Sequence, residues 1–356
     1  MKKHAKPVLH LPRREVLRMG GYGVLGLMIA AATRSVAHAQ TPNLETLKAN
    51  LSSFRMGEFN ANYATQWTYR LAQAHGYYED IGITDFEVIL SDEYMPGLIG
   101  GSLDITHGDT SVFLGAANAS GLPIKQISMY RDKEFWIMGV GAGIETPEDL
   151  KGKKITGGQL DGRNTWVMKK VLAKMGLDPE QDVEFVPTSG GSDNRLAAVI
   201  NGTIDAASMF PRHEAALVDA GGKFLHKELT EAPQEGFGTM QAWLDANEDT
   251  AYAWVHAELK ARRWLFDPAN EERAYQIMVD LGYEIPDSFR ALYQVELSQI
   301  SPDGGFESAE VMDQFLSDLA ETGDVPAGMD WRKVLDMTYV WAAQDALGLE
   351  RRPASL

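Results

Sequence analysis

One internal duplication limits the folds open to this chain more than any other feature of the sequence. The segment Leu98–Thr106 resembles the segment Val199–Ala207, at a constant offset of 101 positions. Each copy ends a predicted helix at a glycine turn and then starts a short apolar strand. A chain built in this way contains two copies of one structural unit. The matched positions are Gly101 with Gly202, Asp104 with Asp205, Gly121 with Gly222, and Ile124 with Leu225.

Within each copy, the hydrophobic pattern predicts alternating strands and helices in the order β-α-β-α-β. The segments 86–90 and 183–186 are largely apolar runs, each with one glutamate, and such runs are typical of parallel strands covered by helices on both faces. Helices are predicted near 63–75 and 164–175, each followed by a glycine. The sequence therefore predicts an α/β fold with two duplicated lobes.

Two further segments are predicted to cross between the lobes, at 131–141 and 236–244. They divide the chain into a first part of lobe I at 51–138, lobe II at 139–236, and a return strand with C-terminal helices at 237–356. Amphipathic stretches predict that these helices pack on lobe I. They are expected near 248–265, 270–281, 287–299, 308–321 and 330–347.

The first 39 residues have the order of an export signal. Three lysines precede the pair Arg13-Arg14, an apolar stretch follows at 20–32, and Ala37-His38-Ala39 offers small residues for cleavage. This order predicts a twin-arginine signal peptide over 1–39, cleaved after Ala39, and a periplasmic protein. A membrane anchor is the alternative, but the apolar stretch is shorter than the ~20 residues that span a bilayer.

Composition excludes several classes of function. The chain has no cysteine, which rules out disulfides, thiolate metal sites, cysteine nucleophiles and a lipid-anchored cysteine. Its 33 basic and 50 acidic residues give a net charge of −17, which repels nucleic acid and anionic lipid. We therefore expect no nucleic-acid partner; the acidic surplus also fits adaptation to a salty habitat.

Several motifs resemble those of periplasmic solute-binding proteins. The segment 143–156, with its Leu150-Lys-Gly-Lys-Lys run, resembles a signature of these proteins, as do 74–78, 101–105, 174–179 and 202–206. Up to about residue 245, the chain resembles the branch that includes binders of nitrate, alkanesulfonates, taurine and thiamine precursors. The resemblance implies a type II periplasmic-binding-protein fold, a small-molecule ligand, an ABC permease as partner, a monomer, no cofactor and no catalysis.

Two alternatives from other classes stay open. The branch includes a pyrimidine-synthesising enzyme, but its cysteine-rich motif is absent from this chain. Another enzyme on the same scaffold would need a nucleophile with its base or a cofactor, and the sequence shows no such arrangement, P-loop or dinucleotide fingerprint. A sensory protein that presents a ligand to a receptor would have the same sequence features.

Candidate ligand-binding residues lie where predicted strands give way to helices. In open α/β sheets, ligands bind beyond the carboxyl ends of the strands, where helix N-termini present free N–H groups. The two lobes supply such turns in pairs that face each other. The predicted ligand-binding residues are Asn60, Tyr63, Asp92, Tyr94, Asp109, Thr110, Arg163, Asn164, Thr165, Ser189, Phe210 and Arg212.

The chemistry of these residues favours an organic ligand. Arg163 and Arg212 have guanidinium groups that bind carboxylates or sulfonates through two hydrogen bonds, whereas Asp109 attracts an ammonium group. Helix capping alone also explains Asn164 and Asp109. The predicted order is an organic anion or zwitterion first, a pyrimidine-like or aromatic heterocycle second, and an inorganic anion last. The histidines show no metal-binding spacing.

Overall fold

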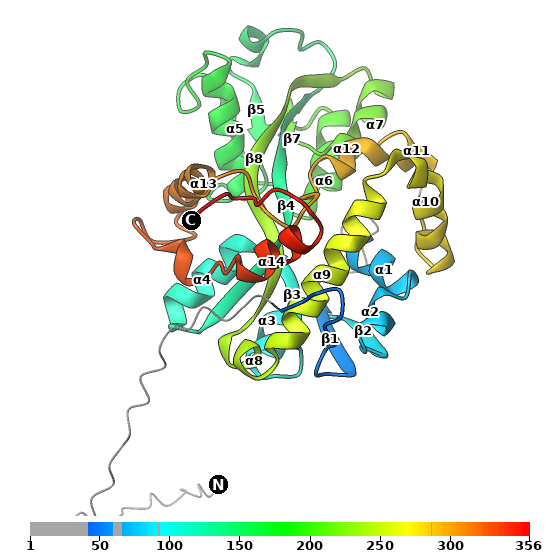
Figure 1. The fold of residues 1–356 in the computed structure, drawn as a ribbon. Coiled ribbons are helices and arrows are strands. Elements are labelled where there is room, and N and C mark those ends of the chain that lie inside the picture. Colours follow the sequence, from blue (N-terminus) through cyan, green and yellow to red (C-terminus); the bar gives the residue numbers. More distant parts are fainter. Residues whose placement is uncertain (1–41, 60–65, 92, 286) are drawn as a thin grey trace, which may run out of the picture. The chain divides into compact units, whose positions relative to one another are not determined.

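The computed structural model describes residues 42–59, 66–91, 93–285 and 287–356. In this part of the chain, eight strands form one sheet in the order β2-β1-β3-β8-β4-β7-β5-β6 (Figure 1). Three central pairs are antiparallel: β3 with β8, β8 with β4, and β4 with β7. The pairs on either side of them are parallel. The strands are β1 (Ser53–Glu58), β2 (Asp85–Leu90), β3 (Ile105–Asp109), β4 (Ile124–Val140), β5 (Lys154–Thr156), β6 (Glu184–Phe185), β7 (Ala206–Ser208) and β8 (Lys223–Met240).

The predicted duplication is confirmed element by element. The order β1-α1-β2-α3-β3-α4-β4 in the first lobe is repeated as β5-α5-β6-α6-β7-α7-β8 in the second, and α2 is an addition to the first lobe. A 3-10 turn at Pro147–Leu150 leads into the second copy, and another at Pro211–His213 precedes α7. The helices are α1 (Trp67–Ala74), α2 (Tyr77–Asp80), α3 (Tyr94–Ile99), α4 (Thr110–Ser120), α5 (Arg163–Lys174), α6 (Gly191–Ile200) and α7 (Glu214–Asp219).

The repeated aspartates tie together two parallel strands in each lobe. The Asp104 N–H donates to the Arg55 carbonyl at 2.9 Å, and Asp104 Oδ2 accepts the Arg55 N–H at 2.7 Å. Asp205 makes the same two bonds with Lys154, at 2.9 and 2.8 Å. Each aspartate side chain thus supplies the hydrogen-bond acceptor that a backbone N–H of the neighbouring strand would otherwise lack.

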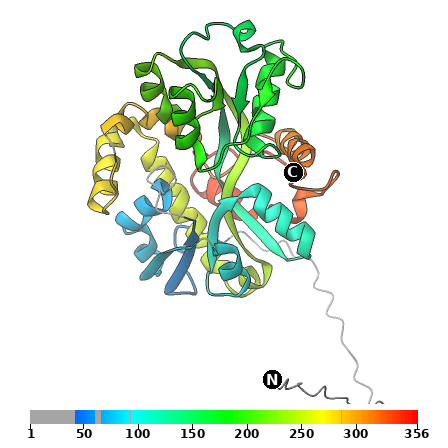
Figure 2. The ribbon, with the colours of Figure 1, turned by 180° about the vertical axis from the view of Figure 1, so that it is seen from behind.

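The two lobes are joined by the long antiparallel strands β4 and β8. They pair from Ile124 opposite Met240 to Val140 opposite Lys223. They run from the end of the sheet near α4 and α8 (Gln241–Ala246) to the end near α5 and α7 (Figures 1 and 2). The predicted crossings at 131–141 and 236–244 each match only part of a strand. Pro233 and the charged residues around it obscure the strand pattern of β8, and the register shifts opposite this proline.

Apolar side chains form separate cores on the two lobes. The largest cluster joins the first lobe to the C-terminal helices and includes Phe54, Trp67 and Trp254. In the second lobe, one cluster around Met168 and Leu172 lies on the α5 side, and another around Met209 and Leu217 includes α7. Helices therefore cover both faces of the second lobe, as its largely apolar strands predict.

The C-terminal region is helical, as predicted. Its longest helix packs against α1, α2 and α14, which belong to the first-lobe side of the molecule, but α13 also reaches β8 and α5. Among the described residues, no helix is both long enough and apolar enough to cross a bilayer. The helices are α8 (Gln241–Ala246), α9 (Glu248–Leu265), α10 (Glu271–Asp280), α11 (Asp287–Arg290), α12 (Tyr293–Leu297), α13 (Ala309–Thr322) and α14 (Thr338–Ala346).

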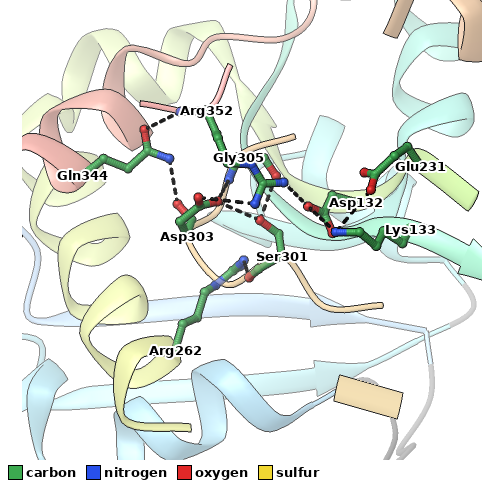
Figure 3. Close-up of polar contacts among 9 residues, drawn as sticks. All are labelled: Asp132, Lys133, Glu231, Arg262, Ser301, Asp303, Gly305, Gln344 and Arg352. Carbon is green, nitrogen blue, oxygen red and sulfur yellow. Dashed lines mark hydrogen bonds and ion pairs between the residues drawn. The ribbon is translucent and has the colours of Figure 1, made fainter. Parts of the chain in front are cut away.

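The C-terminal tail is bound to the middle of β4 by buried charges (Figure 3). The Arg352 guanidinium pairs with Asp132, whose side chain is fully buried, and with Asp303 at 3.4 Å. The Arg352 N–H donates to Gln344 at 3.2 Å, and Gln344 in turn donates to the Asp303 carbonyl at 3.0 Å. The tail thereby neutralises an aspartate in the strand that connects the lobes.

We expect Arg352→Leu to lower the free energy of unfolding by about 3 kcal/mol, because it leaves Asp132 buried with only Lys133 nearby at 3.7 Å. The matched control is Arg351→Leu, since Arg351 pairs with Asp345 on the surface, where such pairs contribute at most about 1 kcal/mol. Urea unfolding of both variants measures the difference. Equal losses would contradict the assigned role of the tail.

Candidate functional site

A cavity of about 330 Å³ lies against the middle of β4 and β8. Its wall includes residues from both lobes, from the crossing strands and from the C-terminal helices. The N-termini of α4 and α5 open onto it, as expected for ligand sites in duplicated α/β lobes. The lining residues include Asp109, Ser111, Arg131, Glu134, Phe135, Arg163, Asn164, Phe210, Gln234, Glu235, Gln299, Phe315 and Asp324.

A buried ion network lies next to this cavity. His107 Nδ1 is 2.9 Å from Glu58 Oε2, and His107 Nε2 is 3.3 Å from Glu235 Oε2. On β4, Arg131 lies 3.7 Å from the same Glu235 oxygen and 3.9 Å from Glu296 Oε2. Two cations and three carboxylates from five elements thus pair with one another beside the cavity.

The network fixes the protonation of its members. Burial alone would lower the pKa of His107, but Glu58 and Glu235 on either side raise it to about 10. Burial likewise opposes ionisation of Glu235, yet Arg131 and His107 lower its pKa to about 2. At neutral pH, His107 is therefore an imidazolium between two carboxylates.

Asp109 presents a carboxylate to the cavity at the start of α4. It is open to solvent on the cavity side, although protein surrounds most of it, and this burial with the charge of Glu235 raises its pKa to about 6. His107, Arg131 and Arg163 act in the opposite direction. Asp109 therefore titrates closer to neutral pH than His107 or Glu235 does.

Arg163, the first residue of α5, lies on the second-lobe side. Its guanidinium makes a bidentate ion pair with Glu134, with Nε 3.4 Å from Glu134 Oε2. It also lies 5.1 Å from the ring of Trp166 and 5.0 Å from that of Phe315. A second cavity of about 540 Å³, lined by these rings and Trp136, shares Arg163 and Glu134 with the first.

The structure brings four of the predicted ligand-binding residues together. Asp109, Arg163, Asn164 and Phe210 all line the cavity, and they come from both lobes. Tyr94 lies beside them: burial, followed by the charges of Asp109 and Glu58, raises its pKa to about 12. These five remain predictions as ligand contacts.

Other predicted residues lie elsewhere. Thr110 is buried and accepts a hydrogen bond from Gln126 at 3.2 Å, and Thr165 donates to the Gln159 carbonyl at 2.7 Å. Ser189 and Arg212 are exposed; Arg212 donates to Ser192 at 2.8 Å. Asn60, Tyr63 and Asp92 fall outside the described residues.

Several cavity and network residues escaped the sequence prediction. Three of them, Arg131, Glu134 and Glu235, lie in the middle of the crossing strands, where no strand-to-helix turn marks them. One signal was present: the charged run Arg131-Asp-Lys-Glu134 interrupts an otherwise apolar strand, and charges in a buried strand need partners. The missed residues are Glu58, His107, Arg131, Glu134, Glu235, Glu296 and Gln299. Within the described residues, no group of three or more acidic or histidine side chains is arranged to hold a metal ion.

Comparison with known proteins identifies the family. The model of the family described as "NMT1/THI5 like" matches residues 67–271, more than half of the chain. The chain belongs to this family. The predicted resemblance to the branch with nitrate and sulfonate binders is thereby confirmed.

Relatives and solved structures agree with this assignment. The nitrate/nitrite binding protein NrtA of Nostoc sp. (strain PCC 7120) is 24% identical over 285 residues, 71% of this chain and 62% of that protein. The putative binding protein YtlA of Bacillus subtilis is 25% identical over 207 residues, 55% of this chain and 61% of that protein. The chain thus spans about three fifths of the length of these curated relatives.

A solved structure confirms the fold. The putative sulfonate-binding protein SsuA of Methylobacillus flagellatus KT superposes with a TM-score of 0.66 at 17% identity, covering 84% of this chain and 96% of that one. The two-lobed α/β fold of the family is therefore shared by this chain.

We expect His107→Gln to lower the free energy of unfolding by about 3–5 kcal/mol, because it leaves Glu58 and Glu235 without the cation between them. The folded-state pKa of about 10 exceeds the ordinary 6.5, so the wild-type contribution is complete below pH 6.5 and is lost as the pH rises toward 10. Denaturant unfolding across this range should show a decline that His107→Gln lacks.

The control for this measurement is His213→Gln. Burial, followed by Arg212, lowers the pKa of His213 to about 4, so this buried histidine is neutral at pH 7. The wild-type decline between pH 6.5 and 10 should persist in His213→Gln. If it also persists in His107→Gln, the assigned imidazolium is wrong.

We expect Asp109→Asn to raise the melting temperature at neutral pH. The pKa of Asp109 is raised from 3.8 to about 6 in the folded protein, so its ionisation opposes folding. The stabilisation should therefore grow as the pH rises from 4 to 6 and stay constant above about pH 7. Melting curves of the ligand-free protein at several pH values measure it, with exposed Asp219→Asn as the control for the loss of one negative charge. A stabilisation that is independent of pH would contradict the raised pKa.

Proposed function

We propose that this chain is the solute-binding component of an ABC importer, which captures a small organic molecule between its lobes. The observation that carries the proposal is the cavity of about 330 Å³ over the crossing strands, with walls from both lobes. Its volume is in the range of small-molecule sites. Bending of β4 and β8 closes such a cleft around its ligand.

The names of relatives support the same role. NrtA is named as a nitrate/nitrite binding protein, and the SsuA structure as a periplasmic sulfonate-binding protein of an ABC transporter. We propose that the chain acts by binding alone, as a monomer without a cofactor, and delivers its ligand to a permease. Export through the twin-arginine signal at 1–39 would place it in the periplasm.

A thermal-shift screen of the purified protein tests this proposal. The panel contains sulfonates, carboxylates, amino acids, amines, pyrimidines and inorganic anions. A ligand at 100 times its dissociation constant adds about 2.7 kcal/mol of stability, which raises the melting temperature by several degrees. We expect one chemical class to give such shifts, and the shifts to be lost in Phe210→Ala, which shortens a cavity wall.

Arg273→Ala is the control, because Arg273 is an exposed residue of α10 and does not line the cavity. It should leave the ligand-induced shift intact. The proposal fails if no class of compound stabilises the protein, or if a stabilising compound acts equally on Phe210→Ala.

A further inference from the structure

The charges on the cavity wall are unfavourable to an anion. Four carboxylates line the wall, those of Asp109, Glu134, Glu235 and Asp324, against the two guanidinium groups of Arg131 and Arg163. The network next to the cavity does not reverse this balance, because the single imidazolium of His107 lies between two glutamates.

Both arginines already have acidic partners. Arg163 binds Glu134 through two hydrogen bonds, and Arg131 lies within 4 Å of both Glu235 and Glu296. Nε and Nη2 of Arg163 are the donors that Glu134 occupies, whereas its Nη1 is buried without a hydrogen-bond partner among the described residues. A sulfonate or carboxylate that took the occupied donors would displace a carboxylate of the protein. A displaced, poorly hydrated carboxylate is costly, so the arginines are weak sites for an added anion.

Two acceptors on the wall, by contrast, are unoccupied. In the described part of the chain, the Asp109 carboxylate takes part in no hydrogen bond or ion pair, and it faces the cavity from the first lobe. Gln299 lines the cavity although only 3% of it is exposed. Its Nε2 donates to Glu296 at 3.0 Å, and its Oε1 accepts no hydrogen bond from the described residues. Oxygen acceptors without donors call for a ligand with N–H groups.

Three phenylalanines form a further part of the wall. Phe135, Phe210 and Phe315 come from β4, the start of the turn before α7, and α13. Arg212 lies 4.7 Å from the ring centroid of Phe210 and Arg163 lies 5.0 Å from that of Phe315, and aromatic rings pack against flat ligands. Size, unsatisfied acceptors and aromatic walls therefore point to the same kind of molecule.

We infer that the cavity binds a cationic nitrogen compound, such as a protonated amine, amidine or amino-substituted heterocycle, whose N–H groups donate to Asp109 and Gln299. This inference rests on the proposed solute-binding function and specifies its ligand. This site should therefore not bind nitrate or simple sulfonates, the ligands after which NrtA and SsuA are named.

Sets of compounds that share a shape but differ in charge test the inference. Benzamidine, benzamide and benzoate form one set; benzylamine, benzyl alcohol and benzenesulfonate form a second; nitrate is added alone. Calorimetry and thermal shift at pH 7.5 should show the cation of each set binding at least tenfold more tightly than its neutral or anionic counterpart. Asp109→Asn should weaken cation binding at least tenfold, and Asp219→Asn, on the exposed face of α7, should not.

The dependence on pH gives a second readout. Cation affinity should fall as the pH drops from 7 to 5, because Asp109 gains a proton near pH 6. The neighbouring His107 and Glu235, with pKa values of about 10 and about 2, keep their charges in this range. In Asp109→Asn this dependence should vanish. The Asn variant removes charge but keeps shape, so a folded variant with weak binding reports on the carboxylate itself.

The outcomes separate the two proposals. Tighter binding of benzoate, benzenesulfonate or nitrate than of the cations would overturn the inference and leave the solute-binding function standing. Cation binding that is unchanged in Asp109→Asn would also overturn it. Stabilisation by no compound, in these sets or in the broader screen, would reject the solute-binding function itself.

Discussion

The imidazolium of His107 is the group on which the centre of this molecule depends. It lies on β3 between Glu58, at the end of β1, and Glu235 on β8, which also pairs with Arg131 on β4. Arg131 in turn reaches Glu296 on α12. Buried charges stabilise a structure only when each has its partner in place. The first lobe, both crossing strands and the C-terminal helices are therefore held in one relative arrangement, and that arrangement forms the floor of the cavity.

The sequence predicts the duplicated fold because the same aspartates and glycines are needed at the same positions in both lobes. Asp104 and Asp205 each bond the backbone of a neighbouring parallel strand, in the same way in both lobes. Gly101 and Gly202 have φ angles of 75° and 70°, which other residues rarely adopt. The extent of the crossing strands was missed because β8 is interrupted by Pro233, and because pairing with β4, a distant segment, holds its charged residues in a strand.

The candidate site was predictable only where it coincides with the turns after strands. Asp109 and Arg163 stand at helix starts, and the structure brings both to the cavity wall. Glu134 and Glu235 lie within strands, and no local pattern indicates that Glu134 pairs with Arg163 or that Glu235 pairs with Arg131. Side chains alternate between faces along a strand, so the charged run on β4 points to both sides: Asp132, next to Arg131, meets the C-terminal tail instead. Which of these charges reaches the cavity is decided by tertiary contacts alone.

The same contacts reverse the chemical meaning of the arginines. Taken alone, a guanidinium at the start of a helix favours a carboxylate or sulfonate ligand. Here Glu134 already occupies Nε and Nη2 of Arg163, so an anion that binds these donors deprives a protein carboxylate of its partner; Nη1 alone is left without a hydrogen-bond partner among the described residues. A cation meets no such competition at Asp109, because this carboxylate has no hydrogen-bond or ion-pair partner in the described part of the chain. The selectivity of the site therefore depends less on which charged residues line it than on which of them are already paired.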